Sequence, residues 1–143
     1  MTKACPAPAR MWASDMRALL ACALALTATA APAQELMTPE DFDIWSSGHT
    51  LDYFIDGTYW GSEAHFPGHA TTDQVDNECR NGSWTPQDGA ICFEYDAEGP
   101  FCWNFWRDGD TVTAKTTDAP EGTPYAVTLS DTPLNCPGPD VGV

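Results

Sequence analysis

Glu63 and His65 are the two side chains whose types and spacing most directly suggest chemistry. They lie two residues apart in Tyr59–Phe66, a segment that is predicted to be a β-strand. Strand alternation would place both on one face, together with Tyr59 and Gly61. A carboxylate beside an imidazole could transfer a proton in a small hydrolase or lyase. This pair is therefore the candidate catalytic site of the chain.

A structural role for Glu63 is the alternative. It could be an acid that faces solvent, or it could be buried and paired with Arg80 or Arg107, because an unpaired buried charge is costly. Abundant carboxylates make any single acid a weak signal for catalysis. The sequence also holds no G-x-S-x-G motif, which is typical of one class of serine hydrolases.

The histidines do not indicate a metal centre. His65 and His69 have the spacing H-x-x-x-H, but Pro67-Gly68 between them breaks the helix that would bring both rings to one face. A turn could still bring the two rings together with Glu63. We predict two loop histidines, no metal ion and no cofactor.

Aromatic side chains are numerous for a core of this size. An aromatic-lined pocket or a surface patch is the functional interpretation, and core packing is the structural one. Trp103 and Trp106 are an odd number of residues apart, so a regular strand places them on opposite faces and at least one could be exposed. The candidate ligand-binding residues are Trp60, Trp84, Trp103 and Trp106.

Short strands must position these residues. Period-two alternation and turn dipeptides predict seven or eight strands between Gly48 and Leu129, although Asn81-Gly82 could form a tight turn. Before them, Thr38 as N-cap predicts a helix over Pro39–Ser47. The predicted fold class is all-β. It is a small antiparallel meander barrel, with a sandwich as the alternative, and the short N-terminal helix covers one end.

Four cysteines remain once the N-terminal leader is set aside. An even number in a small exported domain predicts two disulfides rather than a zinc site. Cys92 and Cys102 lie in one predicted hairpin and can share a face, which favours Cys92–Cys102 together with Cys79–Cys136. The Pro- and Gly-rich tail Pro133–Val143 would then be held through Cys136.

The leader, Met16–Ala33, has the pattern of a secretory signal: a basic start, an apolar run and an Ala-Pro-Ala cleavage site. Translation could begin at Met11 or Met16, and a loose lipoprotein box at Cys22 is an alternative. The apolar run is too short for a transmembrane anchor. We predict one domain, 34–143, in the periplasm or outside the cell.

Residues 34–143 hold 20 acidic and three basic side chains, a net charge of −17. Nucleic acid is excluded as a partner, because it requires clustered Lys and Arg. The charge also argues against an anionic membrane, and it favours a soluble monomer. It fits a salty medium, in which ions screen the repulsion, and the alternative is a cationic ligand or a divalent metal.

Three motifs of cysteine, glycine and aromatic residues lie in 50–106, about half of the mature chain. They are G-x-Y-W-G-x-E from Gly57, C-x-x-G-x-W from Cys79, and I-C-F-x-Y from Ile91 followed by Cys102-Trp103. This pattern resembles a family of small exported bacterial proteins that is known only as a domain of unknown function. The resemblance implies export and a fold of this kind, and it implies no particular activity.

Binding rather than catalysis is the function that the sequence favours. The predicted partner is a small amphipathic molecule or another exported protein, held by exposed aromatic side chains. Two alternatives stay open: a small hydrolase or lyase that uses Glu63 and His65, and a purely structural protein of the cell envelope.

Overall fold

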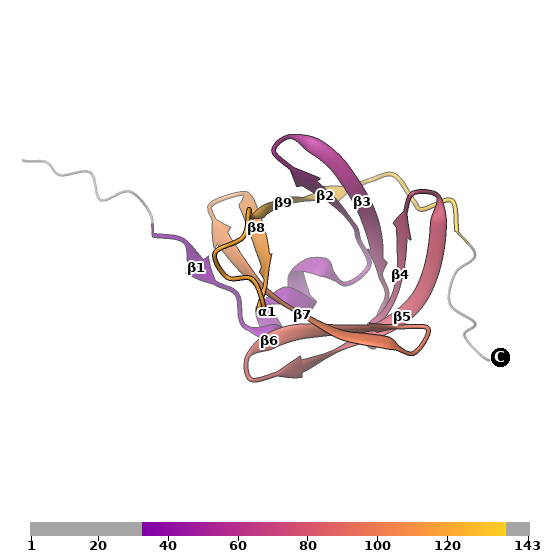
Figure 1. The fold of residues 1–143 in the computed structure, drawn as a ribbon, viewed down its shortest axis with the longest axis horizontal. Coiled ribbons are helices and arrows are strands. Elements are labelled where there is room, and N and C mark those ends of the chain that lie inside the picture. Colours follow the sequence, from indigo (N-terminus) through magenta and orange to yellow (C-terminus); the bar gives the residue numbers. More distant parts are fainter. Residues whose placement is uncertain (1–32, 137–143) are drawn as a thin grey trace, which may run out of the picture. The chain divides into compact units, whose positions relative to one another are not determined.

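Eight antiparallel strands close into a barrel within residues 33–136, the part of the chain that the computed structural model describes (Figure 1). Each strand pairs with the next one along the chain, and the last pairs with the first. The predicted meander barrel is therefore confirmed over the sandwich. The strands are β2 (Thr50–Ile55), β3 (Thr58–His65), β4 (Ala70–Val75), β5 (Glu78–Gln87), β6 (Ala90–Tyr95), β7 (Glu98–Asp108), β8 (Thr111–Thr116) and β9 (Tyr125–Ser130).

A further short strand, β1 (Glu35–Leu36), pairs with β7 opposite Trp106 and Arg107. Apart from Ala33, the predicted secretory signal and its Cys22 lie outside the described residues, as does the tail after Cys136. Within 33–136, no helix combines the length and apolar character needed to cross a membrane.

Four of the hairpin turns consist of two residues with positive φ, which is the type I′ geometry that matches the twist of the strands. Aspartate and asparagine tolerate this left-handed region better than most residues with a side chain. Part of the acidic composition therefore serves the turns. These turns are Asp56-Gly57, Asp76-Asn77, Asp88-Gly89 and Asp96-Ala97, with φ between 45° and 83°.

Helix α1 (Pro39–Ser46) closes one end of the barrel, as predicted. It begins at a capping box, in which Asp41 N donates to Thr38 Oγ1 and Thr38 N donates to Asp41 Oδ2, each at 3.1 Å. Phe42 projects from the helix into the barrel and is fully buried. Its ring centroid lies 4.5 Å from that of Phe105 and 5.4 Å from that of Trp84, so this end of the interior is filled.

Two disulfides link the cysteines in the predicted pairs. Cys92 and Cys102 lie directly opposite each other on β6 and β7. The second bridge joins Cys79 of β5 to Cys136 across a sequence separation of 57 residues, which fixes the segment after β9 to the barrel. Cross-links of this kind stabilise mainly by restricting the unfolded chain.

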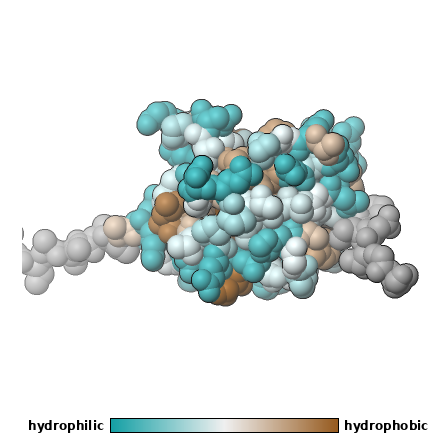
Figure 2. All heavy atoms as spheres, turned by 90° about the horizontal axis from the view of Figure 1, so that it is seen from below, coloured by the Kyte–Doolittle hydropathy of each residue, from teal (hydrophilic) through white to brown (hydrophobic). Residues whose placement is uncertain are grey.

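Most of the acidic side chains lie on the outer surface. Figure 2, a view from below Figure 1, shows a mostly hydrophilic face on which hydrophobic residues form separate small patches.

Candidate ligand-binding cavity

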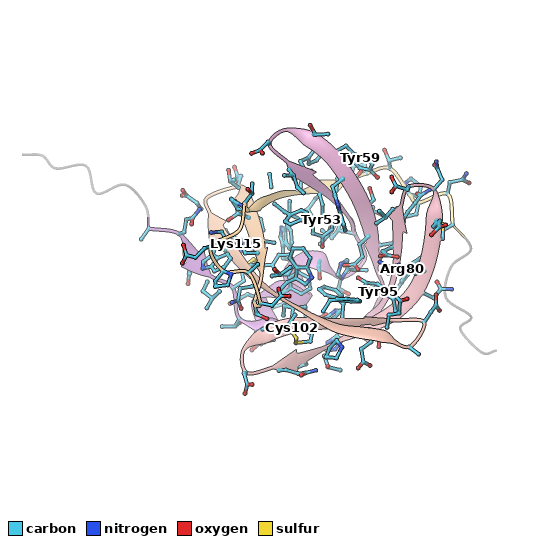
Figure 3. The ribbon with its side chains drawn as sticks, in the orientation of Figure 1. Tyr53, Tyr59, Arg80, Tyr95, Cys102 and Lys115 are labelled. Atoms are coloured by element: carbon cyan, nitrogen blue, oxygen red, sulfur yellow. A yellow bond between two sulfur atoms is a disulfide. The ribbon has the colours of Figure 1, made fainter. Side chains whose placement is uncertain are left out.

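The barrel is open at the end opposite α1, where a cavity of about 430 Å³ extends into the interior. Pockets of this size hold small organic molecules. Figure 3 shows Tyr53, Arg80 and Tyr95 inside the ring of strands. Six aromatic side chains line the cavity, and the buried carboxylates Glu63 and Asp73 lie at its base. The aromatic residues are Tyr53, Trp60, Phe93, Tyr95, Phe101 and Trp103, and the ionisable ones include Glu63, Asp73 and Arg80.

Glu63 lies at the base of the cavity and is only 4% exposed. The Tyr95 hydroxyl donates to its Oε2, and the Tyr53 hydroxyl donates to its Oε1 at 3.5 Å. Burial, followed by the charge of Glu63, raises the pKa of both tyrosines well above the usual value. Both phenols therefore stay neutral and keep their protons directed at the carboxylate.

His65 lies behind Glu63 rather than in the cavity wall. Its Nε2 is 2.7 Å from Glu63 Oε1, at an angle that does not give a straight hydrogen bond, and its ring packs against Phe42 and Phe93. The structure thus brings the two candidate catalytic residues together. A molecule in the cavity would meet Glu63, whereas His65 supports the carboxylate from the core.

The sequence suggested Arg80 as a partner for Glu63. Arg80 does line the cavity, but it pairs with Asp73 instead. Its Nε donates to Asp73 Oδ1 at 3.1 Å, and its Nη2 bonds Asp73 Oδ2. Glu63, Asp73 and Arg80 lie side by side across β3, β4 and β5. Burial raises the pKa of Asp73 while Arg80 opposes the shift, and Asp73 in turn raises the pKa of Arg80. Arg107, the other residue that the sequence suggested as a partner for Glu63, lies on β7 opposite Glu35 of β1.

Tyr95 owes its position to Gly82. A Cβ atom at Gly82 would lie 2.7 Å from Tyr95 Cδ1 and would collide with the Glu94 carbonyl oxygen. The Tyr95 ring therefore lies against bare backbone, with the Arg80 guanidinium carbon 4.7 Å from the ring centroid. Asn81-Gly82 lies within β5 and is not a tight turn.

A β-bulge in β3 changes which aromatic residue of that strand faces the cavity. Tyr53 pairs with Gly61 and Phe54 with Tyr59, so Trp60 is the extra residue. Trp60 turns into the cavity, where its ring lies 6.4 Å from that of Tyr53. Tyr59 packs against Phe54 instead, 5.8 Å between centroids. The prediction that Tyr59 shares a face with Glu63 is therefore wrong, because simple alternation does not hold through a bulge.

The other candidate tryptophans separate into three environments. Trp103 lines the cavity with its ring 5.0 Å from that of Tyr125. Trp84 is buried in the core beside Phe42. Trp106 is opposite Leu36 of β1, on the other face of β7 from Trp103, as alternation predicts. Only Trp60 and Trp103 of the four are thus placed to contact a molecule in this cavity.

The candidate site that the sequence predicted did not include Tyr53, Tyr95 or Asp73. A signal for Asp73 was present, since a two-residue turn at Asp76-Asn77 sets Asp73 directly opposite Arg80. Within residues 33–136, no three His, Cys, Asp or Glu side chains are grouped so that they could hold a metal ion.

No protein family, curated protein or solved structure matches this chain. The resemblance to a family of unknown function therefore stays a prediction, and the case for a function depends on the geometry of the cavity.

Proposed function

We propose that this protein binds a small amphipathic molecule inside its barrel. The observation that carries the proposal is the cavity itself, about 430 Å³ in volume, with an aromatic wall and ionisable groups at its base. Such a distribution suits a ligand with an apolar body and one polar end, because few polar groups fix its orientation while the wall supplies contact area. Trp60 and Phe101, each more than 40% exposed, lie at the cavity and would become covered on binding.

Binding is a better account of this arrangement than hydrolysis or lyase chemistry with Glu63 and His65. The Glu63 carboxylate already accepts a hydrogen bond on each oxygen, from Tyr53 and from Tyr95, so neither oxygen is free to take a proton from a substrate without giving up a partner. His65 is held between Phe42 and Phe93, where it cannot reach a substrate in the cavity. Its place beneath the carboxylate suits a supporting role.

Filling the cavity tests the proposal. Thr116 and Thr113 lie on β8 on opposite faces, because Thr116 lines the cavity and Thr113 pairs opposite Trp106. We expect Thr116→Trp to abolish the binding of Nile red, a neutral amphipathic dye, measured by its fluorescence. The matched variant Thr113→Trp should bind the dye like the unsubstituted protein. Equal binding by both variants, or no binding by the unsubstituted protein, would contradict the proposal.

The proposed site of action is outside the cytosol. The two disulfides are compatible with an oxidising compartment, and they are the structural support for the predicted export. We expect material recovered from the periplasm or the medium to begin at Gln34. Recovery of all of the protein from the cytosol, with an intact leader, would contradict this.

A further inference from the structure

Carboxylates outnumber cations among the described residues that line the cavity. Glu63, Asp73 and Asp118 are acidic, and Arg80 is the one basic side chain in this set. The Arg80 charge is already paired with two carboxylates. Its guanidinium group bonds Asp73, and its Nη1 lies 3.4 Å from Glu98 Oε2. The base of the cavity therefore has a negative potential, and its burial limits screening by salt.

The hydrogen-bonding groups at the base are also acceptors more than donors. The hydroxyl protons of Tyr53 and Tyr95 both point at Glu63. Towards a ligand, these two hydroxyl oxygens can therefore act only as hydrogen-bond acceptors. The carboxylate oxygens are acceptors as well. A ligand group that donates several hydrogen bonds would match this base, whereas a carboxylate or phosphate would meet like charge.

The wall provides the apolar surface that the rest of the ligand would contact, with Trp60 and Trp103 among its residues. Both indoles are held by Tyr125, whose ring packs edge-to-face with each of them, with centroids 5.5 Å from Trp60 and 5.0 Å from Trp103. The net charge of −17 on residues 34–143 would also raise the local concentration of a cationic ligand.

We infer that the ligand of this cavity is an organic amine, protonated at neutral pH and attached to an apolar body small enough for a cavity of about 430 Å³. Its ammonium group would donate to Glu63 and the tyrosine oxygens, and its body would lie between Trp60 and Trp103. This inference rests on the proposed function and adds the charge and chemical class of the ligand.

Three probes of similar size and different charge test the inference. They are 2-phenylethylamine (cationic), 2-phenylethanol (neutral) and phenylacetate (anionic), each titrated calorimetrically at pH 7 into the disulfide-bonded protein. We expect the amine to bind at least about tenfold more tightly than the alcohol, and phenylacetate to bind most weakly. Glu63→Gln should bring amine and alcohol close to equal affinity.

A second variant covers the case in which Glu63→Gln does not fold. Asp118 is exposed and lines the cavity, so Asp118→Asn should fold and should reduce the preference for the amine by a smaller factor. Asp110, which is exposed in the turn between β7 and β8, provides the control Asp110→Asn, with the preference unchanged.

The outcomes separate the two proposals. If the alcohol binds as tightly as the amine, or phenylacetate binds more tightly, the inference is overturned and the binding function stands. If Nile red binds but none of the three probes does, the inference is likewise overturned. If neither Nile red nor any probe binds, both proposals fail.

Discussion

Replacing Phe42 by Ala should lower the free energy of unfolding by about 3–5 kcal/mol, the usual cost of removing a fully buried aromatic side chain. The ring has no exposed surface, and it contacts aromatic residues from four strands of the barrel: His65, Trp84, Phe93 and Phe105. It is the part of α1 that fills this end of the interior. Urea unfolding with an unchanged m value measures the effect.

Ile44 on the same helix supplies the control, since it is 74% exposed. Ile44→Ala should change the free energy of unfolding by no more than about 0.5 kcal/mol, as is usual for surface positions. If Phe42→Ala were equally mild, α1 would not be a structural plug, and the cavity would have no defined base.

The free energy of unfolding should also fall steeply as the pH rises above about 10, the ordinary pKa of tyrosine. Below that pH, both Tyr53 and Tyr95 are neutral in the folded and unfolded chains. Above it, the unfolded chain releases these protons, while the raised pKa of each buried phenol keeps them bound in the folded protein. Each tyrosine then removes about 1.4 kcal/mol per pH unit until the pH reaches its folded pKa.

Phenylalanine variants show which tyrosines cause this loss of stability at high pH. Tyr53→Phe and Tyr95→Phe should each reduce the contribution of the pair by about half. Tyr59→Phe should leave it unchanged, because the Tyr59 ring is 55% exposed. The slopes are compared rather than the absolute stabilities, since removing either buried hydroxyl also takes a donor from Glu63. A profile that stays flat from pH 9 to 11 would contradict the buried tyrosine–carboxylate cluster.

Local rules were sufficient for the parts of the fold that depend on neighbouring residues. The capping box of Thr38 and Asp41 marked the start of the helix, and Asp-Gly pairs marked hairpin turns. The even spacing of the strands then allowed a meander, and the positions of Cys92 and Cys102 in one hairpin predicted their disulfide. In each case, the deciding interaction joins residues that are close in sequence or symmetric about a turn.

The cavity base could not be predicted in the same way, because it depends on pairing between distant residues. Glu63 and Tyr95 are 32 residues apart, and their contact requires both the closed barrel and the missing side chain at Gly82. The bulge at Trp60 is a shift of one residue that no alternation pattern reveals. Sequence analysis therefore found Glu63, Trp60 and Trp103 as candidates but not the environment that relates them.

Two-dimensional NMR of the indole N–H groups tests the central proposal most directly, since residues 34–143 contain five tryptophans in different environments. On titration with 2-phenylethanol, we predict that the Trp60 and Trp103 resonances shift together and saturate. The resonances of Trp45, Trp84 and Trp106 should move little. Shifts confined to Trp106 or Trp45, with Trp60 and Trp103 unchanged, would place binding outside the barrel and contradict the account.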